Sequence, residues 1–71
     1  MAAWRIERMG QGPNGETVQL MIYETGKGRH KFRSWKIFVN GTQVDYAATA
    51  NDAEENFDRA VRTGKGREDK P

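Results

Sequence analysis

The sequence predicts an α+β domain in which an antiparallel sheet of three to four strands carries one C-terminal helix on one face. Apolar and polar residues alternate in several short segments between residues 4 and 47, which is typical of half-buried strands. Turn-forming residues separate these segments, so each strand is expected to pair with the next through a hairpin. A single helical pattern follows, and strands followed by one helix favour this architecture.

The first two strands are expected at residues 4–9 and 17–24. In the first, alternation places Trp4 and Ile6 on one side. Residues 10–15 contain three Gly, one Pro and one Asn, and we expect them to form a turn throughout. The second strand has the clearest alternation. Its faces carry Val18, Leu20 and Ile22 on one side and Gln19, Met21 and Tyr23 on the other.

Two more strands are expected after a turn at residues 26–28. The third strand ends at residue 39, and its inward side chains are Trp35, Ile37 and Val39. The Asn-Gly pair at 40–41 predicts a tight hairpin, because both central positions of a type I′ turn need positive φ. The fourth strand, at residues 42–47, is expected to place Val44 and Tyr46 on one side.

The helix is expected to begin after Thr49 or Asn51, each followed three residues later by an acidic residue as in a capping box. Gly64 ends it. Its apolar stripe consists of Ala53, Phe57, Ala60 and Val61, and favourable i,i+4 pairs are Glu55–Arg59 and Asp58–Arg62. A helix of about 12 residues is about 18 Å long and covers one face of a sheet. The other face should therefore stay open.

The composition predicts one small domain, residues 1–64, followed by a disordered polar tail at residues 65–71. A chain this short buries about 60% of its unfolded surface, so its core is small.

The absence of cysteine excludes disulfides and thiolate metal sites, and it favours a reducing, cytoplasmic setting. The sequence starts without the apolar run of a signal peptide, and no stretch is long enough to span a membrane.

The segment at residues 27–36 is basic and has aromatic residues within it. It holds five cationic side chains and no acidic one: Lys27, Arg29, Lys31, Arg33 and Lys36. His30 and Phe32 lie between them, and alternation would send Phe32 and Lys36 to the face opposite Arg33. Such a segment suits contact with phosphates and unpaired bases, or with an acidic protein surface. The alternative is a solvated hairpin whose charges protect a sheet edge from aggregation.

The open face of the sheet extends this candidate surface. Alternation places Met21, Tyr23, Phe38 and Phe32 there, beside Lys36. Exposed aromatic side chains on a small sheet usually mark a partner or a second copy of the chain. Trp35 belongs instead to the core, because it keeps register with the inward residues of its strand. The expected contact surface is therefore a patch and not a single loop.

Motifs for catalysis or cofactor binding are weak. The Gly-x-Gly-x-x-Gly pattern at 10–15 contains Pro and leads into a strand, so a hairpin loop explains it better than a dinucleotide site. Thr-Gly-Lys-Gly-Arg occurs at 25–29 and 63–67 without the features of a phosphate-binding loop. His30 and Ser34 lie on a basic hairpin, which does not suit a catalytic triad. The helix carboxylates lie on a solvated surface and favour no metal: Asp52, Glu54, Glu55 and Asp58.

Residues 35–41, followed by Thr49 and residues 52–54, resemble part of the sheet-type DNA-binding domains of arm-site integrases. In that family, two strands with a tight turn lead into a Thr-initiated helix rich in Ala and Glu. The resemblance covers residues 34–61, and it implies a sheet that lies in the major groove of DNA.

Residues 22–24, a basic turn, residues 39–44 and the short acidic helix together resemble small phage anti-CRISPR proteins directed at type I interference complexes. The resemblance is one of size, element order and turn placement over nearly the whole chain. It implies a compact binder that masks the surface of a Cas subunit or obstructs the path of DNA.

We therefore expect a non-catalytic binding protein without a cofactor. The leading hypothesis is a phage-type inhibitor that docks on a host nucleoprotein complex such as a CRISPR–Cas effector, in the host cytoplasm if phage-encoded. The alternative is a small sheet-type nucleic-acid-binding domain, and a third hypothesis is a homodimer formed across the open face. The residues expected at the partner are Tyr23, Lys27, Arg29, His30, Lys31, Phe32, Arg33, Lys36 and Phe38.

Overall fold

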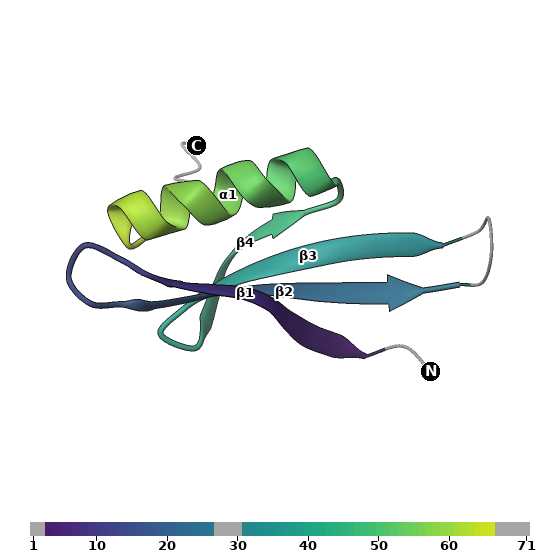
Figure 1. Cartoon of the computed structure of the whole chain (residues 1–71), viewed down its shortest axis with the longest axis horizontal. Helices are drawn as coiled ribbons and strands as arrows, with labels where there is room; N and C mark the ends of the chain where they lie inside the picture. Colours follow the sequence, from purple (N-terminus) through teal and green to yellow (C-terminus); the bar gives the residue numbers. More distant parts are fainter. Residues whose placement is uncertain (1–2, 27–30, 67–71) are drawn as a thin grey trace.

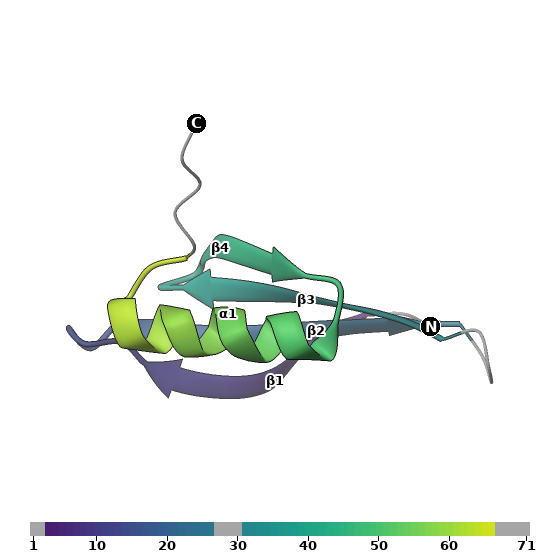
Figure 2. The same cartoon turned by 90° about the horizontal axis from the view of Figure 1, so that it is seen from above.

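The computed structural model describes residues 3–26 and 31–66 and confirms the predicted α+β fold. One antiparallel sheet contains, in sequence order, β1 (Trp4–Gln11), β2 (Thr17–Thr25), β3 (Phe32–Val39) and β4 (Thr42–Ala47). The helix α1 (Ala50–Thr63) lies across one face of this sheet (Figures 1 and 2). Within the two described ranges, no helix is long and apolar enough to cross a membrane.

The core lies between α1 and the two central strands. As predicted, alternate residues of β2 and β3 are almost fully buried there: Val18, Leu20, Ile22, Trp35, Ile37 and Val39. The helix contributes Ala53, Phe57 and Ala60, with Val44 and Val61 packed at the margin. Full burial of a large apolar side chain contributes about 1.5–3 kcal/mol. Much of the stability therefore comes from the β2–β3 pair under the helix.

The loop between β1 and β2 is shorter than predicted. Gly10 and Gln11 continue β1 and pair with β2, so the turn begins at Gly12, whose carbonyl accepts a hydrogen bond from Gly15 N at 3.1 Å. Glycine is suited to position 10 of the strand because the helix packs directly onto the backbone there and leaves little room for a side chain. A Cβ at this position would lie only 3.0 Å from Val61 Cγ2. Here glycine marks a close approach of helix and strand, whereas the sequence suggested a turn.

A β-bulge interrupts β1 between Ile6 and Arg8. The extra residue is Glu7, which accepts a hydrogen bond from Trp35 Nε1 at 3.1 Å and so lies on the helix side of the sheet. Ile6, opposite Met21, lies on the other side. The bulge thus changes which face the β1 side chains occupy, as bulges generally do.

A second irregularity lies between β3 and β4, where Phe38 pairs with Gln43 but Ile37 pairs with Asp45. The residue skipped in β4 is Val44, which packs against the core. Tyr46 lies opposite Lys36 on the far face and is 53% exposed. The prediction that Val44 and Tyr46 share a side is therefore wrong, because the bulge shifts the alternation by one residue.

The turn between β3 and β4 has the predicted geometry. Asn40 and Gly41 have φ values of 51° and 84°, as a type I′ turn requires. Asn40 N also donates to the carbonyl oxygen of Thr17 at 2.8 Å, and Thr17 N donates to Asn40 Oδ1 at 3.0 Å. The turn residue therefore joins the end of β3 to the start of β2.

The ends of α1 are capped as expected. Thr49 Oγ1 accepts a hydrogen bond from Asp52 N at 3.2 Å, which satisfies a free amide of the first turn. Gly64 ends the helix in the left-handed region with φ 72°. Thr49 is thus the cap, and the alternative start at Asn51 is not used.

A buried polar cluster attaches α1 to β4. Asn56 is 6% exposed, and its Nδ2 donates to the carbonyl oxygen of Tyr46 at 3.0 Å and to Asp45 Oδ1 at 3.4 Å. Its Oδ1 accepts from Arg59 Nη1 at 2.9 Å, and Arg59 also contacts Asp45 Oδ2 at 3.7 Å. Arg59, which the spacing had paired with Glu55, therefore contributes to the attachment of the helix.

The outer ends of β2 and β3 extend past the N-terminal end of α1, so the helix does not cover them (Figures 1 and 2). On the helix side of this extension, Arg33 lies opposite Glu24, and Glu24 Oε1 accepts from Arg5 Nη2 at 2.9 Å. The opposite side of the same strands continues the surface that α1 leaves uncovered. The hairpin therefore presents a charged side and an aromatic side.

Candidate functional site

The surface of the sheet that faces away from α1 is the candidate site, and we refer to it as the open face. Its side chains follow from the strand register, because residues directly opposite one another point to the same side. They form three rows across the strands: Trp4–Tyr23–Ser34, Ile6–Met21–Lys36–Tyr46 and Met9–Gln19–Phe38–Gln43. Phe32, opposite Thr25, adds an aromatic ring near the hairpin.

Two aromatic rings and one lysine of the open face lie close together. The rings of Trp4 and Tyr23 have centroids 5.1 Å apart and are tilted by 41°. Lys36 Nζ lies 4.5 Å from the centroid of the Trp4 ring, although β2 separates their strands. The lysine side chain therefore lies along the surface, where its ammonium group makes a cation–π contact.

The open face has an unusual charge balance for a chain that is 31% charged. In residues 3–26 and 31–66, the rows contain one cation, Lys36, and no acidic side chain. The acids of the strands belong to the helix side: Glu7 bonds Trp35, Glu24 bonds Arg5, and Asp45 bonds Asn56. An anionic partner therefore meets attraction at Lys36 and no nearby repulsion from these rows.

Apolar exposure on this face is large. The exposed large hydrophobic residues of the described ranges are Ile6, Met9, Phe32 and Tyr46, and all four belong to the open face. Trp4, Met21, Tyr23 and Phe38 are half-buried beside them. Contiguous apolar exposure of this kind is typical of an interaction surface.

The structure brings together four of the predicted contact residues: Tyr23, Phe32, Lys36 and Phe38. It separates Arg33 from them, because Arg33 lies on the helix side opposite Glu24. Lys31 is exposed immediately before β3. Lys27, Arg29 and His30 lie outside the described residues. The described part of the candidate site therefore lies on the sheet.

Four large apolar residues of the open face were predicted neither as contacts nor as members of that face: Trp4, Ile6, Met9 and Tyr46. Alternation had put Trp4 and Ile6 on one side of a strand, but it gave no means of deciding which side faces the helix. The faces of Met9 and Tyr46 could not be assigned from the alternation, because a bulge shifts the alternation in each of their strands. The sequence signal that could have identified these residues is their composition, because aromatic and thioether side chains are enriched at binding surfaces.

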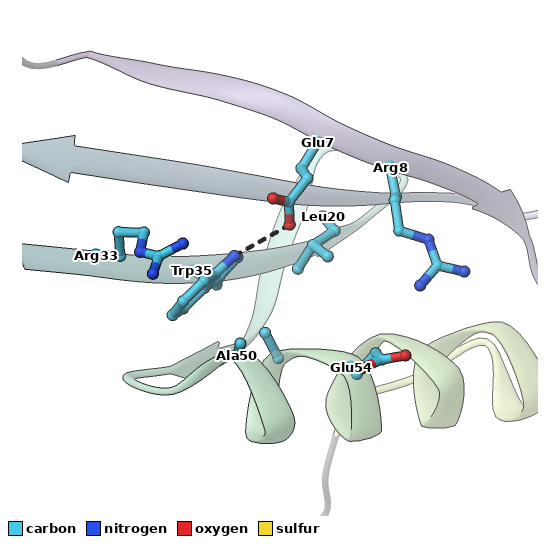
Figure 3. Close-up of a pocket in the computed structure, with 8 residues that line it drawn as sticks. Glu7, Arg8, Leu20, Arg33, Trp35, Ala50 and Glu54 are labelled. Carbon is cyan, nitrogen blue, oxygen red and sulfur yellow. Dashed lines mark hydrogen bonds between the residues drawn. The ribbon is translucent and has the colours of Figure 1, made fainter.

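A cleft on the helix side is the second candidate. It has a volume of about 230 Å³ and is lined by Glu7, Arg8, Leu20, Arg33, Trp35, Ala50, Ala53 and Glu54 (Figure 3). Its charged groups are partly engaged: Glu7 bonds the indole of Trp35, and the Arg8 guanidinium lies 4.7 Å from the centroid of the Phe57 ring. In the described ranges, no group of three or more His, Cys, Asp or Glu side chains could hold a metal ion. The cleft therefore gives a weaker indication of a ligand than the open face does.

No family model matches the chain, and neither a curated protein nor a solved structure matches it.

Proposed function

We propose that this protein is a non-catalytic, phage-type inhibitor that docks on a host nucleoprotein complex through the open face of its sheet. The observation that supports the proposal is the exposed aromatic and thioether surface around Lys36 on the side that α1 leaves uncovered. The resemblance to small phage anti-CRISPR proteins makes a type I CRISPR–Cas effector the first complex to test.

The composition of the open face favours docking. Aromatic residues and methionine are enriched at protein interfaces, whereas Lys, Glu and Asp are depleted. Trp and Tyr residues in particular often supply most of the binding energy. Trp4, Tyr23 and Tyr46 lie on this face with Met9 and Met21. A pre-formed sheet also presents these side chains without a large cost of ordering.

The direct test is capture from bacteria that carry a type I CRISPR–Cas system, followed by mass spectrometry of the bound subunits. We expect the tagged protein to retain Cas subunits and to restore plaque formation by a targeted phage. Tyr46→Asp should lose both activities, because it places a negative charge on the open face at an exposed position. Capture of no Cas subunit, with no gain in plaques, would falsify the proposal.

Asn51→Asp is the matched control. It adds the same negative charge at an exposed position in the first turn of α1, away from the open face. We expect it to behave as the unmodified protein in both assays. Equal loss in Tyr46→Asp and Asn51→Asp would point to a general charge effect and count against docking through the open face.

A further inference from the structure

We infer that the component contacted by the open face is single-stranded nucleic acid, with bases stacked on its aromatic rings and Lys36 at a phosphate. This inference rests on the proposed function, because it identifies the part of the nucleoprotein complex that this surface recognises.

The charge of the open face disfavours a second copy of the chain as its occupant. Pairing two identical faces about a two-fold axis would enclose two Lys36 ammonium groups with no acidic side chain of the described rows to compensate them. Enclosing an unpaired charge is costly. An occupant that supplies an anion near Lys36 removes this cost, and phosphate is such an anion.

The aromatic side chains of the open face favour a partner with flat rings, such as unpaired bases. Five aromatic side chains lie on the face against three aliphatic or thioether ones: Trp4, Tyr23, Phe32, Phe38 and Tyr46 against Ile6, Met9 and Met21. Aromatic side chains on a pre-formed sheet can stack with unpaired bases, which all present a π-face. Phe32 is 69% exposed and Tyr46 is 53% exposed, so both rings are accessible without any rearrangement of the strands.

The position of Lys36 matches the alternation of base and phosphate along a strand. Its neighbour across the sheet in β4 is Tyr46, and Phe38 is two residues further along β3 on the same face. Lys36 Nζ lies 4.5 Å from the centroid of the Trp4 ring, so the ammonium group extends across β2 toward the Trp4–Tyr23 pair. A phosphate at Lys36 would therefore have stacking platforms next to it.

Polar side chains between the rings can contact base edges. Gln19 and Gln43 flank Phe38 on the two neighbouring strands, and Ser34 lies beside Tyr23. Amide and hydroxyl groups both donate and accept hydrogen bonds, so they suit exposed Watson–Crick edges. An acidic protein surface would also fit Lys36, but an unpaired strand supplies a phosphate, a flat base and a hydrogen-bonding base edge in every nucleotide. The observations together favour single-stranded nucleic acid.

The test uses the whole chain and a fluorescein-labelled oligo(dT) strand of about 12 nucleotides at about 50 mM salt, with a duplex of equal length for comparison. Binding is followed by fluorescence anisotropy and by tryptophan emission. Trp35 is 4% exposed and Trp4 is half-buried on the open face, so quenching reports contact at Trp4. We expect the single strand to bind more tightly than the duplex and to quench the emission.

Two variants test the assigned roles. Tyr46→Ala should weaken binding by about 5- to 150-fold, the usual effect of removing one stacking ring. Lys36→Gln should weaken binding and reduce the slope of log affinity against log salt by about 0.7, as expected for the loss of one phosphate contact on a single strand. Arg62→Gln is the control, because it removes the same charge from an exposed position on the helix. Circular dichroism confirms that each variant is folded.

Several outcomes overturn the inference. They are no binding at about 50 mM salt, equal affinity for duplex and single strand, or equal losses in Lys36→Gln and Arg62→Gln. Capture of Cas subunits that survives nuclease treatment, together with no oligonucleotide binding, indicates an acidic protein surface as the occupant. That result overturns the inference and leaves the proposed function intact. Oligonucleotide binding without capture of any Cas subunit overturns the proposed docking on a CRISPR–Cas effector and supports single-stranded nucleic acid as the occupant of the open face.

Discussion

Asn56 shows how one buried amide attaches the helix to the edge of the sheet. Its side chain contacts Tyr46 O and Asp45 on β4 and Arg59 on its own helix. Removing it would leave the Tyr46 carbonyl and the Asp45 carboxylate with fewer partners in a region shielded from water. An unsatisfied buried polar group costs about 1–3 kcal/mol.

Asn56→Ala is therefore expected to lower the free energy of unfolding by about 1–3 kcal/mol, measured by urea denaturation. Asn51→Ala is the control on the same helix, at an exposed position where substitutions usually change stability by at most about 0.5 kcal/mol. Equal unfolding midpoints for the two variants would contradict the structural role assigned to Asn56.

Glu16 makes the stability depend on pH. Hydrogen bonds from the backbone N–H groups of Glu16 itself and of Asn14 lower the pKa of this carboxyl group from its ordinary value of 4.5. Because the pKa is lower in the folded state, the ionised form stabilises the fold above about pH 4.5. This contribution is lost as the pH falls from that value through the folded-state pKa.

The difference in unfolding free energy between the unmodified protein and Glu16→Gln should therefore be constant above about pH 5 and shrink below it. Urea denaturation at a series of pH values measures this difference. Glu55→Gln, at an exposed helix position, is the comparison. A difference for Glu16→Gln that grows as the solution becomes more acidic would show that the sign of the shift is wrong.

Among the elements, the hairpin between β3 and β4 was the easiest to predict, because Asn-Gly determines a turn from two adjacent residues. The structure adds a second role for Asn40, whose Oδ1 accepts a hydrogen bond from Thr17 N on β2. The side chain thus supports both the positive φ of the turn and the register of the neighbouring strand.

Two substitutions separate these roles. Asn40→Gly keeps the positive φ accessible and removes only the hydrogen bond from Thr17 N to Asn40 Oδ1, so we expect a loss of about 1 kcal/mol. Asn40→Ala removes the contact and also pays the strain of φ 51°, so it should lose about 1–2 kcal/mol more. Urea denaturation of both variants decides this order, and an alanine variant as stable as the glycine variant would contradict it.

The sequence predicted β2, β3 and α1 well because their signals are local and periodic. It failed at β4, where Val44 and Tyr46 separate at a bulge that depends on pairing with β3. It also missed Gly10, whose role arises from the approach of Val61 on a helix far along the chain. The open face was predicted only in part for the same reason. Met9 belongs to it because of a bulge that is not visible in the alternation, and the alternation of Trp4 and Ile6 does not say which side faces the helix.

At the scale of the whole molecule, one helix of 14 residues cannot cover both faces of a four-stranded sheet. The uncovered face would be expected to pair with itself, since exposed aromatic and thioether side chains associate readily. Lys36 at its centre opposes this, because two copies would bring two ammonium groups together without an acid from the described rows. This single lysine would thus keep the surface available for the anionic partner proposed above.

We therefore expect the protein to be a monomer at low salt and Lys36→Leu to form a dimer whose fraction rises with protein concentration. The leucine removes the repulsion and adds apolar area beside Trp4, so the two copies gain contact without a charge to desolvate. Light scattering coupled to size exclusion measures the mass of each species.

Lys65→Leu makes the same change at an exposed position after the helix and should stay monomeric. Raising the salt to about 1 M shortens the screening length to about 3 Å and should move the unmodified protein part of the way toward the dimer. A dimer of the unmodified protein at low salt would show that Lys36 does not prevent self-association, and the open face would then have a second copy of the chain as its partner.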